Sequence, residues 1–182
     1  PLVTIPQGQI GYVFARDGTV LPPTQTLARN VTANDFQDVR AFLKSGGQRG
    51  PQRKILREGT YALNLAQFIV LTKERNYAIS LGRDESALFQ QMADLIGKRN
   101  GFEPLVIKDS DDLIGIITVH DGPALPAGEI IAPTVANDTG NPAFHNNFQD
   151  PEKFLEAGGF RGRQYQVLAD GSPQVLPTPV NL

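Results

Sequence analysis

Short apolar stretches separated by turn residues run through most of the chain. Residues 9–15 and 113–119 are rich in β-prone side chains, and an Asp-Gly turn follows each of them closely, so each is predicted to be the first strand of a hairpin. Three further β-prone stretches are residues 54–56, 60–63 and 68–72. This pattern predicts a fold built mainly from short strands.

One segment has helical periodicity instead. Its apolar residues recur on one side of a helix and predict an amphipathic helix over residues 86–99. Acidic residues precede this segment and basic residues end it, as the helix dipole favours. Residues 103–108 are then predicted to form a strand, followed by an acidic turn at 109–112. The apolar residues of the helix are Leu88, Phe89, Met92, Leu95 and Ile96.

The chain contains an internal repeat. At an offset of 104 residues, Ile10-Gly11 matches Ile114-Gly115 and several later positions match in the same order. A short insertion in the second copy changes the offset to 112 residues, where Phe36-Gln37-Asp38 matches Phe148-Gln149-Asp150. The matches then continue through Gly59 and Gly171. A run of this length in order indicates duplication of one structural unit.

The second copy locates a short helix in both. Proline is tolerated at the first position of a helix, so Pro151 places an N-cap at Asp150 and, by alignment, at Asp38. The predicted helices span 39–45 and 151–157, and each ends at a Gly-Gly pair suited to a left-handed turn. Their predicted buried residues are Phe42, Leu43, Phe154 and Leu155.

These elements predict an α+β fold with two related β-rich units, two short helices and one amphipathic spacer helix. The apolar fraction of 40% is sufficient for a buried core. The predicted organisation is a first repeat unit, a helical spacer with a strand, a second partial unit and a proline-rich tail. Their bounds are 3–75, 76–108, 109–171 and 172–182.

Composition excludes several classes of function. The chain has no cysteine, so it holds no disulfide, thiolate metal site or cysteine nucleophile. The net charge of −2 and scattered basic residues give no reason to expect a nucleic-acid partner. No apolar run approaches the roughly 20 residues of a membrane-spanning helix. The chain begins with Pro1 and has no signal-peptide pattern, so we expect a soluble piece of a longer protein.

Two glycine-rich loops are the candidate binding sites. Each places an arginine among glycines, where converging backbone N–H groups and a guanidinium could bind a phosphate or carboxylate. The alternative is structural: the glycines end the short helix, and the arginine pairs with a protein carboxylate or carbonyl. The residues are Gly47, Arg49 and Gly50 in the first copy and Gly159, Arg161 and Gly162 in the second.

Other candidate chemistry is weaker. His120 and His145 are the only histidines and could form a catalytic or metal-binding pair, but solvent-exposed loop positions are the ordinary explanation for both. The aspartates of 109–112 resemble part of a calcium loop but lack its glycine and terminal glutamate. We therefore expect no catalytic residues, no metal and no cofactor. A hydrolase that uses carboxylates or His120 is the remaining enzymatic alternative.

Several motifs resemble a known family. Residues 6–13 (PQGQIGYV) and 58–64 (EGTYALN) are similar to elements of stomatin/prohibitin/flotillin (SPFH, or Band 7) domains. Between them, residues 34–38 and 46–52 are similar to an insertion in bacterial flotillin-like members. The resemblance implies a membrane-associated scaffold that forms large homo-oligomers, organises lipids or partner proteases, and has no catalytic residues in this domain.

The chain departs from the family pattern at particular residues. Glu58 and Leu65 stand where prolines are usual, and the second copy lacks the opening Pro-x-Gly. The leading hypothesis is a non-enzymatic scaffold piece of a self-associating protein that contacts a membrane or membrane proteins through its longer parent. The alternative is a β-rich module that binds a small ligand or anion through Arg49 and Arg161.

Overall fold

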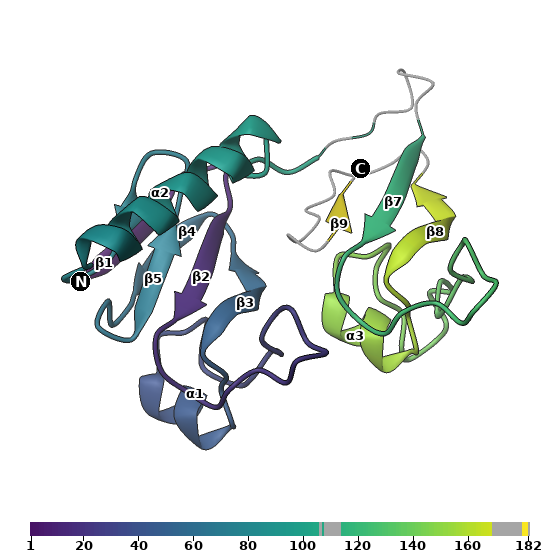
Figure 1. Ribbon diagram of the computed structural model, residues 1–182, viewed down its shortest axis with the longest axis horizontal. Coiled ribbons are helices and arrows are strands. Elements are labelled where there is room, and N and C mark those ends of the chain that lie inside the picture. The colour runs from purple at the N-terminus through teal and green to yellow at the C-terminus, as the bar shows by residue number, and fades with distance from the viewer. Residues whose placement is uncertain (106, 108–113, 169–179, 182) are drawn as a thin grey trace. The chain divides into compact units, whose positions relative to one another are not determined.

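The computed structural model describes residues 1–105, 107, 114–168 and 180–181, and the chain forms two compact units (Figure 1). Unit 1 comprises Pro1–Pro22 and Leu27–Pro104, and unit 2 comprises Pro23–Thr26 and Leu105–Leu182. Short helices accompany antiparallel sheets, which confirms the predicted α+β class.

Unit 1 is organised around the strand β2 (Gly11–Ala15). Its four-stranded sheet has the order β3-β2-β5-β6, and a separate two-stranded sheet pairs β1 with β4. All of these pairs are antiparallel. The other strands are β1 (Leu2–Ile5), β3 (Gly50–Leu56), β4 (Gly59–Ala62), β5 (Phe68–Leu71) and β6 (Asn76–Tyr77).

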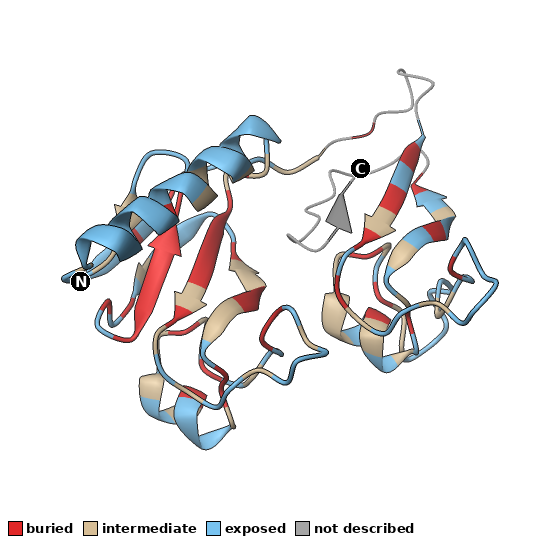
Figure 2. Cartoon of the chain, viewed as in Figure 1, coloured by how far each residue is buried: buried red, intermediate tan, exposed pale blue. Residues whose placement is uncertain are grey.

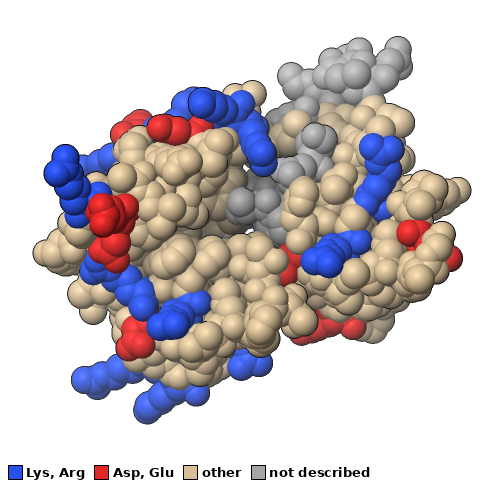
Figure 3. All heavy atoms as spheres, in the orientation of Figure 1, with Lys and Arg blue, Asp and Glu red and all other residues tan. Residues whose placement is uncertain are grey.

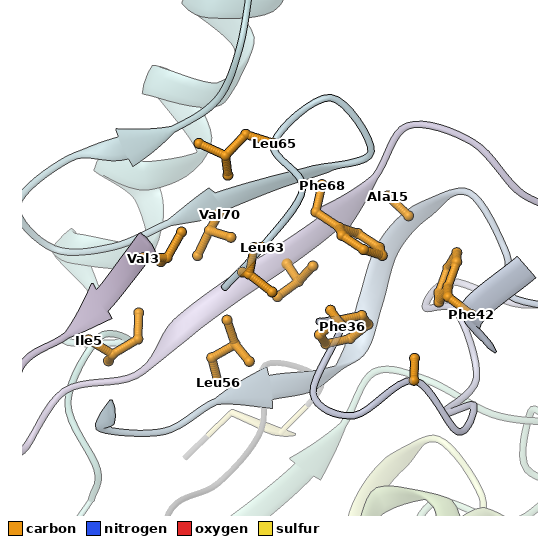
Figure 4. Close-up of a cluster of buried hydrophobic side chains, with 12 residues drawn as sticks. Val3, Ile5, Ala15, Phe36, Phe42, Leu56, Leu63, Leu65, Phe68 and Val70 are labelled. Atoms are coloured by element: carbon orange, nitrogen blue, oxygen red, sulfur yellow. The ribbon is translucent and has the colours of Figure 1, made fainter. Parts of the chain in front are cut away.

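The core of unit 1 lies on one side of this sheet (Figure 4). Alternate residues of a strand point to the same face, so Val13 and Ala15 of β2 both enter this cluster. Phe42 of helix α1 (Val39–Lys44) packs edge-on against Phe68, with ring centroids 5.1 Å apart. Phe36 packs against the same ring at 5.3 Å. Three phenyl rings therefore join helix, loop and sheet.

Helix α2 (Arg83–Lys98) covers the opposite face of the sheet, as Figures 1 and 2 show. Its Phe89 is buried and packs edge-on against Phe14 of β2, with ring centroids 5.1 Å apart. The helix begins earlier than the predicted residue 86 because the Glu85 carboxylate accepts the Gly82 backbone N–H at 3.0 Å and caps its first turn.

Unit 2 repeats part of this architecture. Its sheet has the order β8-β7-β9, and helix α3 (Pro151–Glu156) precedes β8. The pairing of β7 (Gly115–Val119) with β8 (Gly162–Leu168) has the register of β2 with β3 at every matched position, including the bulge. β9 (Val180–Asn181) pairs with β7 where β5 pairs with β2. The duplication predicted from sequence is therefore also a duplication of fold.

The short helices confirm the predicted N-caps. The Asp38 and Asp150 carboxylates accept backbone N–H groups at 2.9 and 3.1 Å. The predicted Gly-Gly stops are also confirmed, because Gly46 and Gly158 have φ of 75° and 86°. Of the residues predicted to be buried in these helices, Phe42 and Phe154 are buried, Leu155 is half-buried, and Leu43 is exposed.

Several sequence predictions were wrong. The Asp-Gly turns after β2 and β7 do not form hairpins, because the chain leaves the sheet there and returns only at β3 and β8. For the strand predicted over 103–108, residues 106 and 108 lie outside the described residues, so it stays a prediction. The spacer predicted over 76–108 is not separate, since its helix belongs to unit 1. The acidic turn at 109–112 and residues 172–179 of the predicted tail lie outside the described residues.

Among the residues that the structure describes, no helix combines the length and apolar character needed to cross a bilayer.

Candidate functional site

The two glycine loops, residues 46–50 and 158–162, have the same geometry. In each, the first glycine is left-handed and turns the chain out of the short helix. The second glycine lies against the helix's own phenylalanine: a β-carbon on Gly47 would lie 2.5 Å from Phe42, and one on Gly159 would lie 2.4 Å from Phe154. Both glycines are therefore required by packing, independently of any ligand.

In each loop, three backbone N–H groups bond to the protein's own carbonyls, namely those of Gly46, Gly47 and Arg49 and of Gly158, Gly159 and Arg161. Gly47 donates to Phe42 at 2.8 Å, and Gly159 donates to Phe154 at 2.9 Å. The two arginine amides also donate internally: Arg49 bonds to the carbonyl of Thr19, and the equivalent Arg161 to that of Pro123. Amides that are used in this way cannot converge on an anion. The amides of Gly47, Arg49, Gly159 and Arg161 are thus used within the fold.

In each unit a buried glutamine donates hydrogen bonds to two carbonyls of the loop, an arrangement that we call the glutamine clamp. The Gln52 side-chain amide donates to the carbonyls of Gln48 and Gly50 at 2.8 and 2.9 Å. The equivalent Gln164 donates to the carbonyls of Phe160 and Gly162, both at 2.8 Å. A primary amide has two N–H donors on one nitrogen, which is sufficient to satisfy both carbonyls. The sequence repeat contained this signal, because the two glutamines align, but the pattern alone did not reveal their role.

The side chains of Arg49 and Arg161 are exposed. The structure brings Arg49 together with Gly47 and Gly50 in one loop, and Arg161 with its own pair of glycines in the other. On the face drawn in Figure 3, basic and acidic atoms lie interspersed among uncharged ones. Each unit therefore presents one exposed guanidinium beside its loop glycines.

The expectation of a solvent-exposed loop position was wrong for His145. It is fully buried, and its Nδ1 accepts the Phe148 backbone N–H at 2.8 Å. Its Nε2 therefore carries the proton and donates to the Val135 carbonyl at 2.9 Å. Burial lowers the pKa of His145, outweighing the opposing effect of the Val135 hydrogen bond. With both nitrogens occupied by backbone groups, this imidazole is available neither as a metal ligand nor as a base.

The remaining candidates do not assemble into a site. His120 is exposed at the end of β7 and occupies the position of Arg16 in unit 1. Across the residues that the structure describes, no three His, Asp or Glu side chains gather closely enough to hold a metal ion. The three aspartates predicted as a calcium-loop fragment, Asp109, Asp111 and Asp112, lie outside the described residues.

Sequence reasoning missed one surface. The outward side of the β7–β8 pair carries Ile116, Thr118, Arg163, Tyr165 and Val167, which we call the open face. Tyr165 is 74% exposed, and the directly paired Ile116 and Val167 are 46% and 42% exposed. The sequence contained a usable signal for this surface. Apolar residues occur on both faces of β7, and a strand of that kind normally has both faces covered.

Comparisons with known proteins add no identification: no family model matches the chain, and no curated protein or solved structure shows significant similarity to it.

Proposed function

We propose that this chain is a non-enzymatic scaffold module of a membrane-associated, self-associating protein of the flotillin-like type. The observation that carries the proposal is the kind of residue that the two units share. The shared capping aspartates, loop glycines and clamping glutamines all contact the chain's own backbone or core. Duplication has preserved an architecture, as expected where the repeated unit serves as structure.

The placement of the SPFH-like motifs supports this proposal. The motifs at 6–13 and 58–64 are far apart in sequence but meet in unit 1. Ile5, next to the first motif, pairs with Gly59 of the second, and the Gly8 backbone N–H donates to the Glu58 carboxylate at 3.1 Å. Motifs that form one structural element are better grounds for a family resemblance than motifs scattered over a surface.

The described side chains also favour a structural role over catalysis. The buried imidazole is held by backbone groups, and three amides of each loop bond internally. General acid–base chemistry needs a group within reach of substrate, with its proton free to transfer. His145 does not meet that requirement, and Arg49 and Arg161 are permanently protonated cations rather than proton-transfer groups.

Self-association and membrane binding test the proposal directly. Light scattering coupled to gel filtration, over a concentration series of the chain and of a longer protein that contains it, should show oligomers. Co-sedimentation of the longer protein with phosphatidylcholine vesicles, with and without phosphatidylserine, should show membrane binding. A longer protein that stays monomeric and remains in the supernatant with both vesicle types would overturn the proposal.

One observation favours the anion-binding alternative: an exposed arginine occupies the same loop position in both units. Calorimetric titration with inorganic phosphate and with a polyanion, compared between the wild-type chain and the Arg49→Gln/Arg161→Gln double variant, separates it from scaffolding. Heat that disappears in the variant would support anion binding, and no heat in either protein would remove this alternative.

A further inference from the structure

The open face of unit 2 points to a second function. We propose that it is the docking site for an amphipathic α-helix that buries an aromatic residue and carries acidic residues in its first turn. The internal repeat supplies the template, because the equivalent face of unit 1 is already covered by such a helix. This inference goes beyond the proposed scaffold role and does not depend on it.

The two faces correspond residue by residue. Ile116 and Thr118 of β7 stand where Tyr12 and Phe14 stand on β2, and the strand pairing has the same register in both units. On the partner strands, Val167 corresponds to Ile55. Across this pair of strands, a packed segment therefore meets the same arrangement of backbone and β-carbons in both units.

In unit 1, α2 and the turn after it bury this face. Phe89 packs on Phe14, and the ring of Phe102 lies 5.7 Å from that of Tyr12. The Tyr12 hydroxyl donates to the Gly101 carbonyl, which joins the end of the helical segment to the sheet. As a result Tyr12 is 9% exposed, whereas Ile116 at the equivalent position is 46% exposed.

The differences between the faces indicate the size of the occupant's side chains. Thr118 is smaller than Phe14, and Ile116 is smaller than Tyr12, so the face of unit 2 leaves room over β7 for a large residue. Tyr165 is exposed on the neighbouring strand and stands beside that space. An aromatic residue from the docked helix would gain both apolar burial and a ring contact there.

The charges around the open face indicate where the docked helix carries acidic residues. In unit 1, Arg16 at the end of β2 lies 3.6 Å from Glu85 in the first turn of α2, and it also donates to the Ile79 carbonyl at 3.0 Å. In unit 2 the same position holds His120, and Arg163 is exposed on the open face itself. The face residues include no acidic side chain. A helix with acidic residues at its N-terminus is therefore complementary to this surface.

The test uses α2 itself as the probe. A fluorescently labelled peptide with the sequence of residues 82–103 is titrated into the full chain, and binding is followed by anisotropy. We expect saturable binding with a rise in peptide helicity. Ile116→Asp and, separately, Tyr165→Glu in the protein should each weaken binding at least about tenfold, because a charge would be buried beneath the helix. Phe89→Ala in the peptide should weaken it similarly.

Matched controls make the result specific. Ile130→Asp introduces the same charge at an isoleucine of unit 2 that is 83% exposed in a loop, and it should bind the peptide as the wild type does. Amide spectra of each variant establish that it is folded. Absence of saturable binding, or equal binding by Ile116→Asp, Tyr165→Glu and wild type, would overturn the proposal. Self-association that Ile116→Asp abolishes, without peptide binding, would overturn it in favour of a second copy of the chain.

Discussion

Gly159 lies directly against the ring of Phe154, so closely that a β-carbon added to the glycine would lie 2.4 Å from Cε1. The same relationship joins Gly47 to Phe42 in unit 1. Both phenylalanines are buried, so neither ring can move away without disturbing the core. The contact therefore couples the loop that ends each short helix to the packing of its unit.

Replacing Gly159 with alanine should destabilise unit 2. The added methyl must displace a buried ring, and overpacking of this kind costs about 1–3 kcal/mol in the free energy of unfolding. Urea unfolding followed through amide exchange of unit 2 measures the change. Gly140→Ala is the matched control, because its β-carbon meets only Asp138 at an ordinary 3.6 Å. Equal stability of the two variants would show that the ring contact is not tight.

The buried glutamine clamp gives a second prediction. Gln164→Glu keeps the shape of the side chain but removes both N–H donors, leaving the carbonyls of Phe160 and Gly162 facing a carboxylate. We expect a loss of at least about 1–3 kcal/mol at neutral pH, the cost of leaving buried polar groups unsatisfied. Faster exchange of amides in the 158–162 loop should accompany it. Gln149→Glu, in the same unit and outside the clamp, is the control.

The helix caps give a third prediction. Asp150→Ala removes the carboxylate that accepts the Lys153 backbone N–H and should destabilise unit 2 by about 1 kcal/mol. Asp150→Asn retains an acceptor oxygen and should lose much less. Thermal unfolding of the two variants, monitored by signals from unit 2, distinguishes them. A fall of the same size in both would assign the effect to charge rather than to capping.

A fourth prediction concerns pH. The pKa of His145 is lowered in the folded chain by burial, so the unfolded chain takes up the proton first as pH falls. The contribution of the neutral imidazole to stability is complete above its unfolded pKa of about 6.5 and is lost as pH falls from there through the folded pKa. Unit 2 should therefore melt at a lower temperature at mildly acidic pH than at neutral pH.

The control for this pH dependence is a variant with alanine in place of His145, because unit 1 has an alanine, Ala33, at the equivalent position. His145→Ala should lower the stability of unit 2 at neutral pH, through the lost ring contacts and hydrogen bonds, but remove this part of its pH dependence. Nuclear magnetic resonance titration of the His145 ring gives the folded pKa directly. A value at or above about 6.5 would contradict the prediction.

The sequence predicted local features well where one residue type has one structural role. Proline at 151 fixed the start of both short helices, and the paired glycines fixed their ends. The amphipathic pattern located α2, but it did not show that Leu88 and Leu95 would stay more exposed than Phe89. The side of a helix that meets a sheet depends on tertiary packing, which periodicity specifies only within a broad stripe.

Strand pairing was the main failure of sequence reasoning. An Asp-Gly pair after a strand favours a hairpin, but the Asp17 carboxylate instead accepts the Gly18 N–H at 2.8 Å, and the chain turns away. The candidate site was misjudged for a related reason. Glycines in a loop have the same appearance in sequence whether their amides face a ligand or, as with Gly47 and Phe42, the preceding helix.

The position of β2 within its sheet has a consequence for the order in which the chain acquires structure. Its two neighbours, β3 and β5, end at Leu56 and Leu71, so neither edge of β2 is satisfied by residues next to it in the chain. Contacts of such long sequence separation slow folding, because loop closure precedes any gain from pairing. During synthesis, both edges of β2 stay unpaired until β3 and then β5 leave the ribosome. In that period an apolar strand is exposed to aggregation.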